Sequence, residues 1–364
     1  MLPLGGFGDI TGNEGLGGNY TNFDKFPPKL NPVSEQNILI LNLHIGSRMR
    51  IQIYGAGIAG SYLYHLLSQD FDVSIYDVRD KPDCRCAWGF SYSETKELYK
   101  EIGLNVDDYI LSKPEFVVVN RKLWLKNKEV VILDKKRLME DLWSFEMRDE
   151  GGDIVVDATG SSRAILPKIK NDSVYFTVQY IEKHNLDENI YIYMVKTGYA
   201  WAFPLGDEWH IGAGDLTKER ALNLIKKLRE TYRLEDPKKD CICFGRIRLL
   251  PPSKCKPIVH NNVYGVGEAV GCVSGTGEGN APSLRCAKIF YDCLINDELE
   301  RYEERILREF WWIEIEHKFV SAIQNGKKIT ALMLLPKIIS IESKRSVKHS
   351  FETMKSILSM LIPK

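Results

Sequence analysis

The stretch that decides the fold is "IYGAGIAGSYLYHLL" at residues 53–67, where an apolar strand leads into three glycines and then into a helical pattern. Gly55, Gly57 and Gly60 follow the spacing G-x-G-x-x-G. In a strand–turn–helix unit the first glycine permits a tight turn, the second lets a pyrophosphate approach the backbone, and the third lets the helix pack closely. Alone this spacing is a weak signal, so its context decides its meaning.

The context is a βαβ unit. The strand before the turn begins at Arg50, and a second strand, "DVSIYD", ends at Asp77, 17 residues beyond Gly60 (77 minus 60). A carboxylate at that place can accept both hydroxyls of an adenosine ribose, and it repels a 2′-phosphate, which disfavours NADP. We therefore predict a bound dinucleotide at this turn. The alternative is a glycine-rich turn with a structural role only.

A second glycine-rich element, "VYGVGEAVGCVSGTGEGNAPSLRC" at residues 263–286, indicates which dinucleotide is bound. A strand precedes Gly267 and Glu268, and a helix opens near Gly279 and Asn280. A helix N-terminus suits a pyrophosphate or the anionic edge of a reduced flavin, and Glu268 can accept hydrogen bonds from ribityl hydroxyls. A nicotinamide dehydrogenase needs no such element, whereas a flavin extended across the sheet does. The sequence therefore favours FAD.

Composition excludes several classes of function. Lys plus Arg and Asp plus Glu both number 49 in 364 residues, so no net charge attracts nucleic acid. The 8 cysteines, with C-x-C spacings, predict neither a disulfide scaffold nor a metal site, but thiols in a reducing cytoplasm. No run reaches the roughly 18 apolar residues of a spanning helix. The mixed apolar and basic stretch from Ile329 predicts either peripheral contact with an anionic membrane or a helix with a solvated basic face.

The pattern along the chain predicts an α/β protein of four parts. Residues 1–48 are rich in Gly and Asn and are expected to be a flexible N-terminal extension. Residues 49–170 and 245–297 form a Rossmann-like domain that binds the dinucleotide. Residues 171–244, which alternate apolar and polar side chains, form an inserted antiparallel-sheet substrate domain. Residues 298–364 form a C-terminal helical region.

Within the predicted substrate domain, "YAWAFP" at residues 199–204 places three aromatic side chains on one face of a strand. Tyr199, Trp201 and Phe203 can wall an apolar slot that suits a long hydrocarbon. The alternative is that they fill a core between sheet and helix. His210, on the next strand, is interpreted as an ordinary strand histidine with no assigned role.

With these motifs in view, the chain resembles flavoproteins of the p-hydroxybenzoate hydroxylase fold and, within them, the archaeal-type geranylgeranyl reductases. The resemblance covers about residues 50–302. It rests on G-x-G-x-A-G at 55–60, R-C-A-x-G at 85–89, D-A-T-G at 157–160, Y-x-W-x-F-P at 199–204, and G-E-A-V-G with T-G-E-G at 267–279. The second and fourth motifs are the more specific to the reductases.

The resemblance implies a role for each matching residue. Ala59 and Asp77 would face the adenosine part of FAD, while Cys86, Ala87 and Gly89 would line the flavin. Glu268 stands where the family usually has Asp, Lys135 where relatives often carry Arg, and Asn280 replaces a common Ile. The full implied FAD-binding set is Gly55, Gly57, Ala59, Gly60, Asp77, Cys86, Ala87, Gly89, Lys135, Gly160, Gly267, Glu268, Gly279 and Asn280.

The activity implied by the resemblance is FAD-dependent saturation of carbon–carbon double bonds in an isoprenoid chain, on a polyprenyl lipid. The flavin delivers a hydride to one alkene carbon and a proton reaches the other; Cys86 and Tyr199 are candidate proton donors by chemistry only. The electron donor is either NAD(P)H or a ferredoxin-like protein. Two alternatives stay open, namely a flavin monooxygenase or halogenase on the same fold, and a non-catalytic flavin-binding electron carrier.

Overall fold

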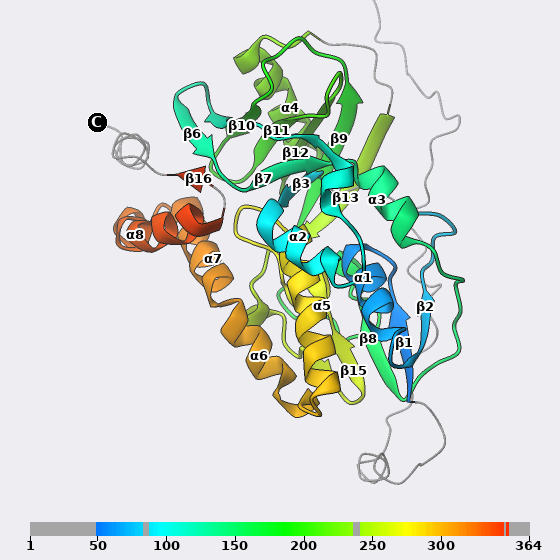
Figure 1. Cartoon of the computed structure of the whole chain (residues 1–364). Coiled ribbons are helices and arrows are strands. Elements are labelled where there is room, and N and C mark those ends of the chain that lie inside the picture. The colour runs from blue at the N-terminus through cyan, green and yellow to red at the C-terminus, as the bar shows by residue number, and fades with distance from the viewer. Residues whose placement is uncertain (1–48, 83–86, 236–240, 346, 349–364) are drawn as a thin grey trace, which may run out of the picture.

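The computed structural model describes residues 49–82, 87–235, 241–345 and 347–348 (Figure 1). The predicted extension at residues 1–48 and the candidate residue Cys86 lie outside the described residues. Within the described chain the strands form sheets of five, eight and three strands, and the helices pack around them.

The five-stranded sheet is the predicted Rossmann-like core, with the order β14-β15-β8-β1-β2. Strands β1 (Arg50–Tyr54), β2 (Asp72–Tyr76), β8 (Ile154–Asp157) and β15 (Val263–Gly265) are parallel, and β14 (Val259–His260) pairs antiparallel at the edge. Ile51, Ile53 and Val156 are fully buried, as expected for central strands covered on both faces. Helices α1 (Ile58–Leu67) and α5 (Asn280–Ile295) pack against each other beside this sheet (Figure 1). The predicted fold class is therefore confirmed.

The eight-stranded sheet has the order β13-β9-β12-β11-β10-β5-β6-β16. Its central hairpin is β11 (Tyr199–Pro204) with β12 (Trp209–Asp215), flanked by β9 (Val174–Glu182), β10 (Ile190–Met194) and β13 (Cys241–Arg248). Helix α4 (Lys218–Tyr232) covers one face, where Ala221, Leu224 and Leu228 join a buried cluster with Ala200 and Ala202 of β11. The opposite face carries the side chains of Tyr199, Trp201 and Phe203. The alternation predicted for this strand is confirmed.

The large sheet also recruits two strands that the sequence analysis placed in the FAD-binding domain. Strand β5 (Phe116–Val119) pairs parallel with β10, and β6 (Leu123–Asn127) pairs antiparallel with β5. The continuous apolar run of β5 is compatible with either sheet, and only the long-range pairing with β10 decides between them. Residues 116–127 therefore belong to the sheet of the substrate domain, and the single boundary predicted at residue 170 is wrong for them.

A three-stranded sheet joins the two larger ones, with the order β3-β7-β4. Its strands are β3 (Gly89–Ser91), β4 (Ile110–Ser112) and β7 (Val130–Leu133), and helices α2 (Tyr92–Lys100) and α3 (Lys135–Leu142) follow β3 and β7 directly. The predicted C-terminal helical region contains α6 (Tyr302–Glu309), α7 (Trp311–Gln324) and α8 (Lys328–Arg345), and then returns to the large sheet through β16 (Val347–Lys348). Among the described residues, every helix is too short or too polar to cross a membrane.

Candidate functional site

The glycine turn after β1 has the geometry that a pyrophosphate site needs. Gly55 has a φ of +99°, and a Cβ atom there would lie 2.4 Å from the carbonyl oxygen of Ala158. A Cβ atom on Gly60 would lie 1.8 Å from the carbonyl oxygen of Gly55, so α1 packs closely on the turn. In contrast, a Cβ atom on Gly57 would meet nothing within 4 Å. Space is therefore open beside the turn, at a helix start whose N–H groups attract anions.

Asp77 lies directly after β2 and holds this turn. Its Oδ2 accepts a hydrogen bond from the Ala56 N–H at 2.8 Å, and its two oxygens accept from the Arg79 guanidinium at 2.8 and 2.6 Å. Burial acts to raise the pKa of Asp77, but the bonds from Arg79 and Ala56 outweigh it and hold the pKa below its ordinary value. No motif in the sequence pointed to Arg79, whose charge offsets the repulsion of a 2′-phosphate. The contact of Asp77 with a ribose stays a prediction.

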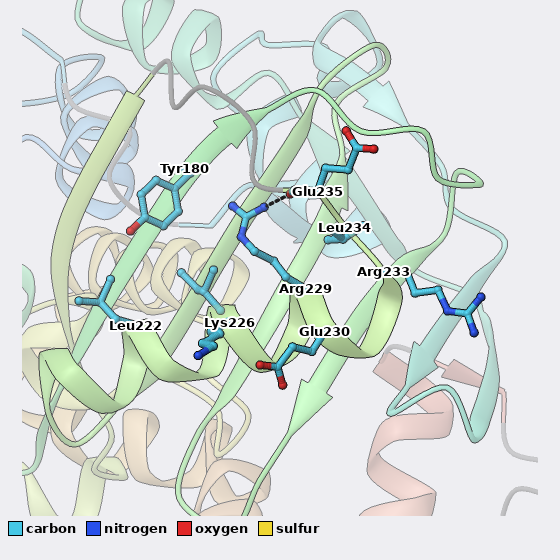
Figure 2. Close-up of a pocket in the computed structure, with 9 residues that line it drawn as sticks. Tyr180, Leu222, Lys226, Arg229, Glu230, Arg233, Leu234 and Glu235 are labelled. Carbon is cyan, nitrogen blue, oxygen red and sulfur yellow. Dashed lines mark hydrogen bonds between the residues drawn. The ribbon is translucent and has the colours of Figure 1, made fainter. Parts of the chain in front are cut away.

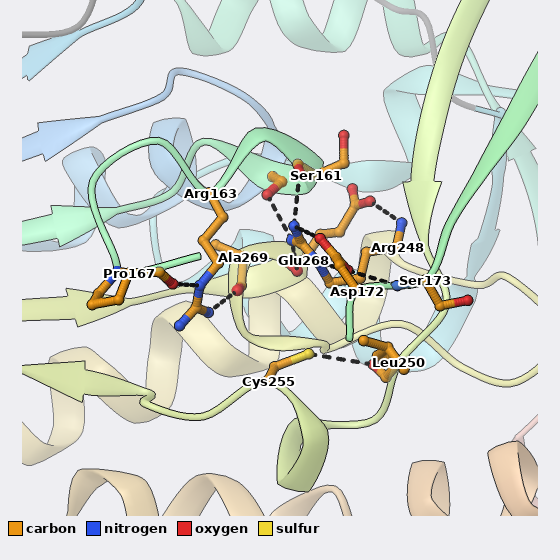
Figure 3. Close-up of polar contacts among 11 residues, drawn as sticks. Ser161, Arg163, Pro167, Asp172, Ser173, Arg248, Leu250, Cys255, Glu268 and Ala269 are labelled. Atoms are coloured by element: carbon orange, nitrogen blue, oxygen red, sulfur yellow. Dashed lines mark hydrogen bonds and ion pairs between the residues drawn. The ribbon is translucent and has the colours of Figure 1, made fainter. Parts of the chain in front are cut away.

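The D-A-T-G and G-E-A-V-G motifs meet beside the contacts of Arg248 and Glu268 that Figure 3 draws. A Cβ atom on Gly160 would lie 3.5 Å from Oε2 of Glu268, and Oε1 of Glu268 accepts a hydrogen bond from the Arg248 N–H at 2.6 Å. The Arg248 guanidinium in turn binds Asp172 at 2.9 Å and the carbonyl oxygens of Gly160 and Ser161. Burial raises the pKa of Glu268 to about 7. One oxygen of Glu268 therefore binds the backbone at the end of β13, while the other lies beside Gly160 of the D-A-T-G motif.

The G-E-A-V-G motif also reaches the glycine turn after β1, because a Cβ atom on Gly267 would lie 3.2 Å from the Cβ atom of Ala59. Ala59 is in the first turn of α1, next to the open space at Gly57. Five predicted cofactor residues that are far apart in the sequence thus lie along one continuous path: Gly57, Ala59, Gly267, Glu268 and Gly160.

Asn280, the first residue of α5, connects the residues predicted to line the flavin. Its Nδ2 donates to the carbonyl oxygens of Ala87 at 3.2 Å and of Gly89 at 3.1 Å, and its Oδ1 accepts from Nζ of Lys135 at 3.0 Å. Lys135 is 1% exposed, so its ammonium group lies inside the protein beside this helix start. Gly279 precedes Asn280 as the N-cap residue of α5 and provides no side-chain cap. The structure brings these five predicted residues together.

The aromatic side chains of β11 adjoin this cluster. A Cβ atom on Gly89 would lie 3.4 Å from the Phe203 ring, and the Tyr199 hydroxyl donates to the carbonyl oxygen of Thr276 at 2.7 Å. Thr276 belongs to the T-G-E-G loop that leads into α5. The ring centroids of Tyr199 and Trp201 are 5.6 Å apart, and those of Trp201 and Phe203 are 6.1 Å apart. We call Tyr199, Trp201 and Phe203 the aromatic wall; its two ends touch the predicted flavin-lining segments.

Sequence reasoning missed His210, which fixes the middle of the aromatic wall. The Trp201 indole N–H donates to Nδ1 of His210 at 3.0 Å, and His210 lies opposite Phe203 in the β11–β12 pairing. Burial, with a smaller contribution from Lys135, lowers the pKa of His210 to about 3. The imidazole is therefore neutral and carries its proton on Nε2. The Trp88 ring lies 5.7 Å from it. The sequence does contain one signal for this contact. A hairpin turn at residues 205–208 pairs Pro204 with Trp209, and the next pair along the two strands is then Phe203 with His210.

A groove of roughly 640 Å³ in the described chain lies elsewhere (Figure 2). It is formed by α4 and β9, and none of its lining residues is a predicted site residue; examples are Tyr180, Leu222, Lys226 and Arg229. The described residues also contain no cluster of His, Cys, Asp and Glu that could hold a metal ion. The predicted site residues that the structure describes lie instead between the glycine turn and the aromatic wall.

The described residues fit FAD. The open space at Gly57 and the start of α1 suit a pyrophosphate, and Glu268 has one carboxylate oxygen directed toward the neighbouring strand loop. At the other end, the uncapped start of α5 and the buried ammonium group of Lys135 place positive charge where a reduced flavin would become anionic. Residues 83–86 lie outside the described residues, so the predicted contact of Cys86 remains a proposal.

Comparisons with known proteins agree with this geometry at the level of the fold. No family model matches the chain. An uncharacterized protein of Methanocaldococcus jannaschii is 26% identical over 82% of this chain and 98% of its own length.

Several solved structures have the same fold. MibH, a tryptophan 5-halogenase, is 13% identical with a TM-score of 0.59 over 80% of this chain and 79% of its own. A flavoprotein/dehydrogenase from Cytophaga hutchinsonii is 13% identical with a TM-score of 0.57 over 86% and 92%. HpxO of Klebsiella pneumoniae, complexed with FAD and uric acid, is 12% identical with a TM-score of 0.52 over 81% and 97%. The chain thus has the fold of flavin-dependent oxidoreductases, and FAD is the cofactor that this fold supports.

Proposed function

We propose that this protein is an FAD-dependent reductase that saturates carbon–carbon double bonds of an isoprenoid chain of the geranylgeranyl type, carried by a polyprenyl lipid. The observation that carries the proposal is the aromatic wall. Its apolar rings meet the predicted flavin-lining residues at Gly89 and at the loop of Thr276. An alkene in a long apolar chain has no polar group to orient it, so a rigid apolar surface beside the cofactor is the feature that such a substrate requires.

The chain's own residues supply positioning. Trp201 is 5% exposed, packs in a buried cluster with Ile190 and Ile192, and its indole is held by His210, so the ring has one fixed orientation within the aromatic wall. Lys135 and Asn280 hold Ala87 and Gly89 against the start of α5, which fixes the site on the opposite side. FAD, when bound and reduced, supplies the hydride for one alkene carbon. The reductant that regenerates it is NAD(P)H or a ferredoxin-like protein.

The second alkene carbon needs a proton, and Tyr199 is the candidate donor among the described residues. Burial, together with the charge of Glu278, raises the pKa of Tyr199 to about 12, so its hydroxyl stays protonated in the neutral range. It donates to the Thr276 carbonyl oxygen and would have to turn from that acceptor toward the substrate. Cys86 is the other candidate.

The second candidate function is oxygenation or halogenation, because solved structures of this fold include an oxygenase and two halogenases. Their identities to this chain are 13 and 14%, which supports a common fold and leaves the reaction open. A non-catalytic electron carrier is the third. An apolar wall suits the reductase best, because a carrier needs no substrate surface.

Product mass separates these candidates. Reduced holoprotein is incubated under argon with a geranylgeranyl lipid, and oxidised holoprotein is incubated in air with NAD(P)H, a chloride salt and the same lipid. If the protein is a reductase, the lipid gains two hydrogens per reduced alkene under argon. Gain of oxygen or halide only in air supports the second candidate, and flavin turnover with an unchanged lipid in both arms supports a carrier.

A further inference from the structure

Helix α8 leaves one face uncovered. Ala331, Leu335 and Ile341 are its buried residues, packed toward the body of the protein. The opposite stripe recurs at helical spacing and is exposed to solvent. We call this stripe the α8 outer face: Ile329, Met333, Pro336, Lys337, Ser340 and Lys344.

The apolar half of this face is unusually open. Ile329 is 77% exposed and Met333 is 75% exposed, while no other large apolar side chain of the described residues exceeds the 55% of Trp311. They are one helical turn apart, so they form a joint apolar edge. Single exposed apolar residues need no explanation, but two adjacent ones at this exposure indicate a surface that something covers.

The charge around the apolar edge has a single sign. Lys318 precedes it on α7, Lys327 and Lys328 stand at the start of α8, and Lys337 and Lys344 continue the stripe. Residues 317–341 contain no Asp or Glu. The one carboxylate of α8, Glu342, is half-buried rather than on the outer face. A second copy of the same face would bring lysines against lysines, whereas anionic lipid headgroups complement them.

The helices that carry this face also hold the candidate site. Glu316 of α7 accepts a hydrogen bond from the Gly275 N–H at 2.9 Å, and Arg345 at the end of α8 lies 3.6 Å from Glu278. Both contacts reach the loop that ends at Asn280. In Figure 1, α8 lies at the edge of the molecule beyond α7. A membrane bound to the α8 outer face would therefore lie against the helices that support the site.

We propose that the α8 outer face docks on the surface of an anionic membrane, with Ile329 and Met333 inserted among the headgroups and the flanking lysines paired with lipid phosphates. This inference rests on the proposed function for its purpose, since a prenyl lipid resides in a membrane. Its physical basis is independent, because exposure and charge produce binding whether or not the enzyme turns over.

The test is co-sedimentation of the flavin-loaded full chain with vesicles of phosphatidylcholine alone or mixed with phosphatidylglycerol. We expect binding to the mixed vesicles that weakens with salt. Each lysine near an anionic surface contributes about fivefold in affinity, so Lys337→Glu with Lys344→Glu lowers binding by about 25-fold or more. Ile329→Ser with Met333→Ser lowers it by at least about tenfold, because the inserted apolar area is lost.

The matched control is Leu222→Ser with Lys226→Glu on α4, an exposed apolar and basic pair one helical turn apart (Figure 2). It should bind as the unchanged chain does, and melting curves should show that every variant is folded. Equal binding to both vesicle types, or equal loss in the control, overturns the proposal.

Two further outcomes also overturn it. A wild-type dimer that the α8 variants convert to a monomer assigns the face to a second copy. Binding that appears only after removal of residues 349–364 assigns it to that segment. Vesicle binding without alkene reduction would leave the docking surface standing and reject the reductase; reduction of lipid by a chain that never binds vesicles would do the opposite.

Discussion

Gly57→Ala separates cofactor binding from folding at the glycine turn. Gly57 has φ −77° and ψ −168°, which an alanine adopts without strain, and its Cβ atom would meet nothing within 4 Å. The folded chain without FAD should therefore keep its stability, or gain about 0.4–1 kcal/mol from the lower entropy of the unfolded chain. The new methyl group occupies the space where the pyrophosphate would approach the backbone, so the affinity for FAD should fall.

The magnitude follows from the loss of close approach. Displacing the pyrophosphate from even one N–H bond to an anion removes about 1.5–3 kcal/mol, which is about a tenfold to hundredfold rise in Kd. The assay titrates stripped protein with FAD and follows flavin fluorescence, while urea unfolding reports stability. Gly55→Ala is the contrasting variant, because its Cβ atom would strike the Ala158 carbonyl at 2.4 Å and the fold itself should suffer. An unchanged Kd in Gly57→Ala refutes the pyrophosphate site, and an unfolded Gly57→Ala refutes the steric reasoning.

Four further predictions test neighbouring parts of the account. Asp77→Ala should weaken FAD binding by about tenfold to hundredfold through the lost ribose contacts. If the variant without FAD also melts at a clearly lower temperature than the unchanged chain without FAD, the role of Asp77 is to hold the turn and Arg79 instead. Trp201→Ala should cost about 3–5 kcal/mol of stability and impair reduction of long prenyl chains more than short ones; uniform loss at every chain length would mean a core role only. The pKa of Glu268 rises on folding from its ordinary value to about 7, so its contribution to stability is full below about pH 4.5 and is lost as the pH rises toward 7. Glu268→Gln without FAD should therefore gain stability relative to wild type at pH 8 but not at pH 4, and urea titrations at both values check this. A chain that starts at Met49, which packs against the core, should fold and retain FAD, as flavin absorbance and melting will report.

The parts of the fold that sequence predicts well are those fixed by local geometry. Gly60 could be assigned because the turn at Gly55 leaves no room for a side chain there, and the alternation of β11 placed Tyr199, Trp201 and Phe203 on one face without any knowledge of neighbours. Both signals depend on residues close together in the chain. Such signals can be read before the fold is known, because the alternation of side chains along a strand depends on the backbone alone.

The parts that sequence missed depend on pairing between distant segments. The apolar run of β5 gives no indication that its partner is β10, about 70 residues later. The role of His210 appears only when β12 is placed in register with β11 and the Trp201 indole finds Nδ1. Arg79 is a different case, because it stands only two residues after Asp77 and its guanidinium contact is local. Only the pairing of β5 with β10 is a contact that no local pattern encodes, whereas the His210 contact follows from the register of one hairpin.

The proposed reduction is tested most directly by the flavin itself. Holoprotein is reduced under argon and mixed with a geranylgeranyl lipid or with its fully saturated counterpart, and the visible absorbance of oxidised flavin is followed in time. The account predicts that the absorbance returns with the unsaturated lipid alone, because only an alkene can accept the hydride. Reduced flavin that persists with the unsaturated lipid and reoxidises only when oxygen is admitted would contradict it.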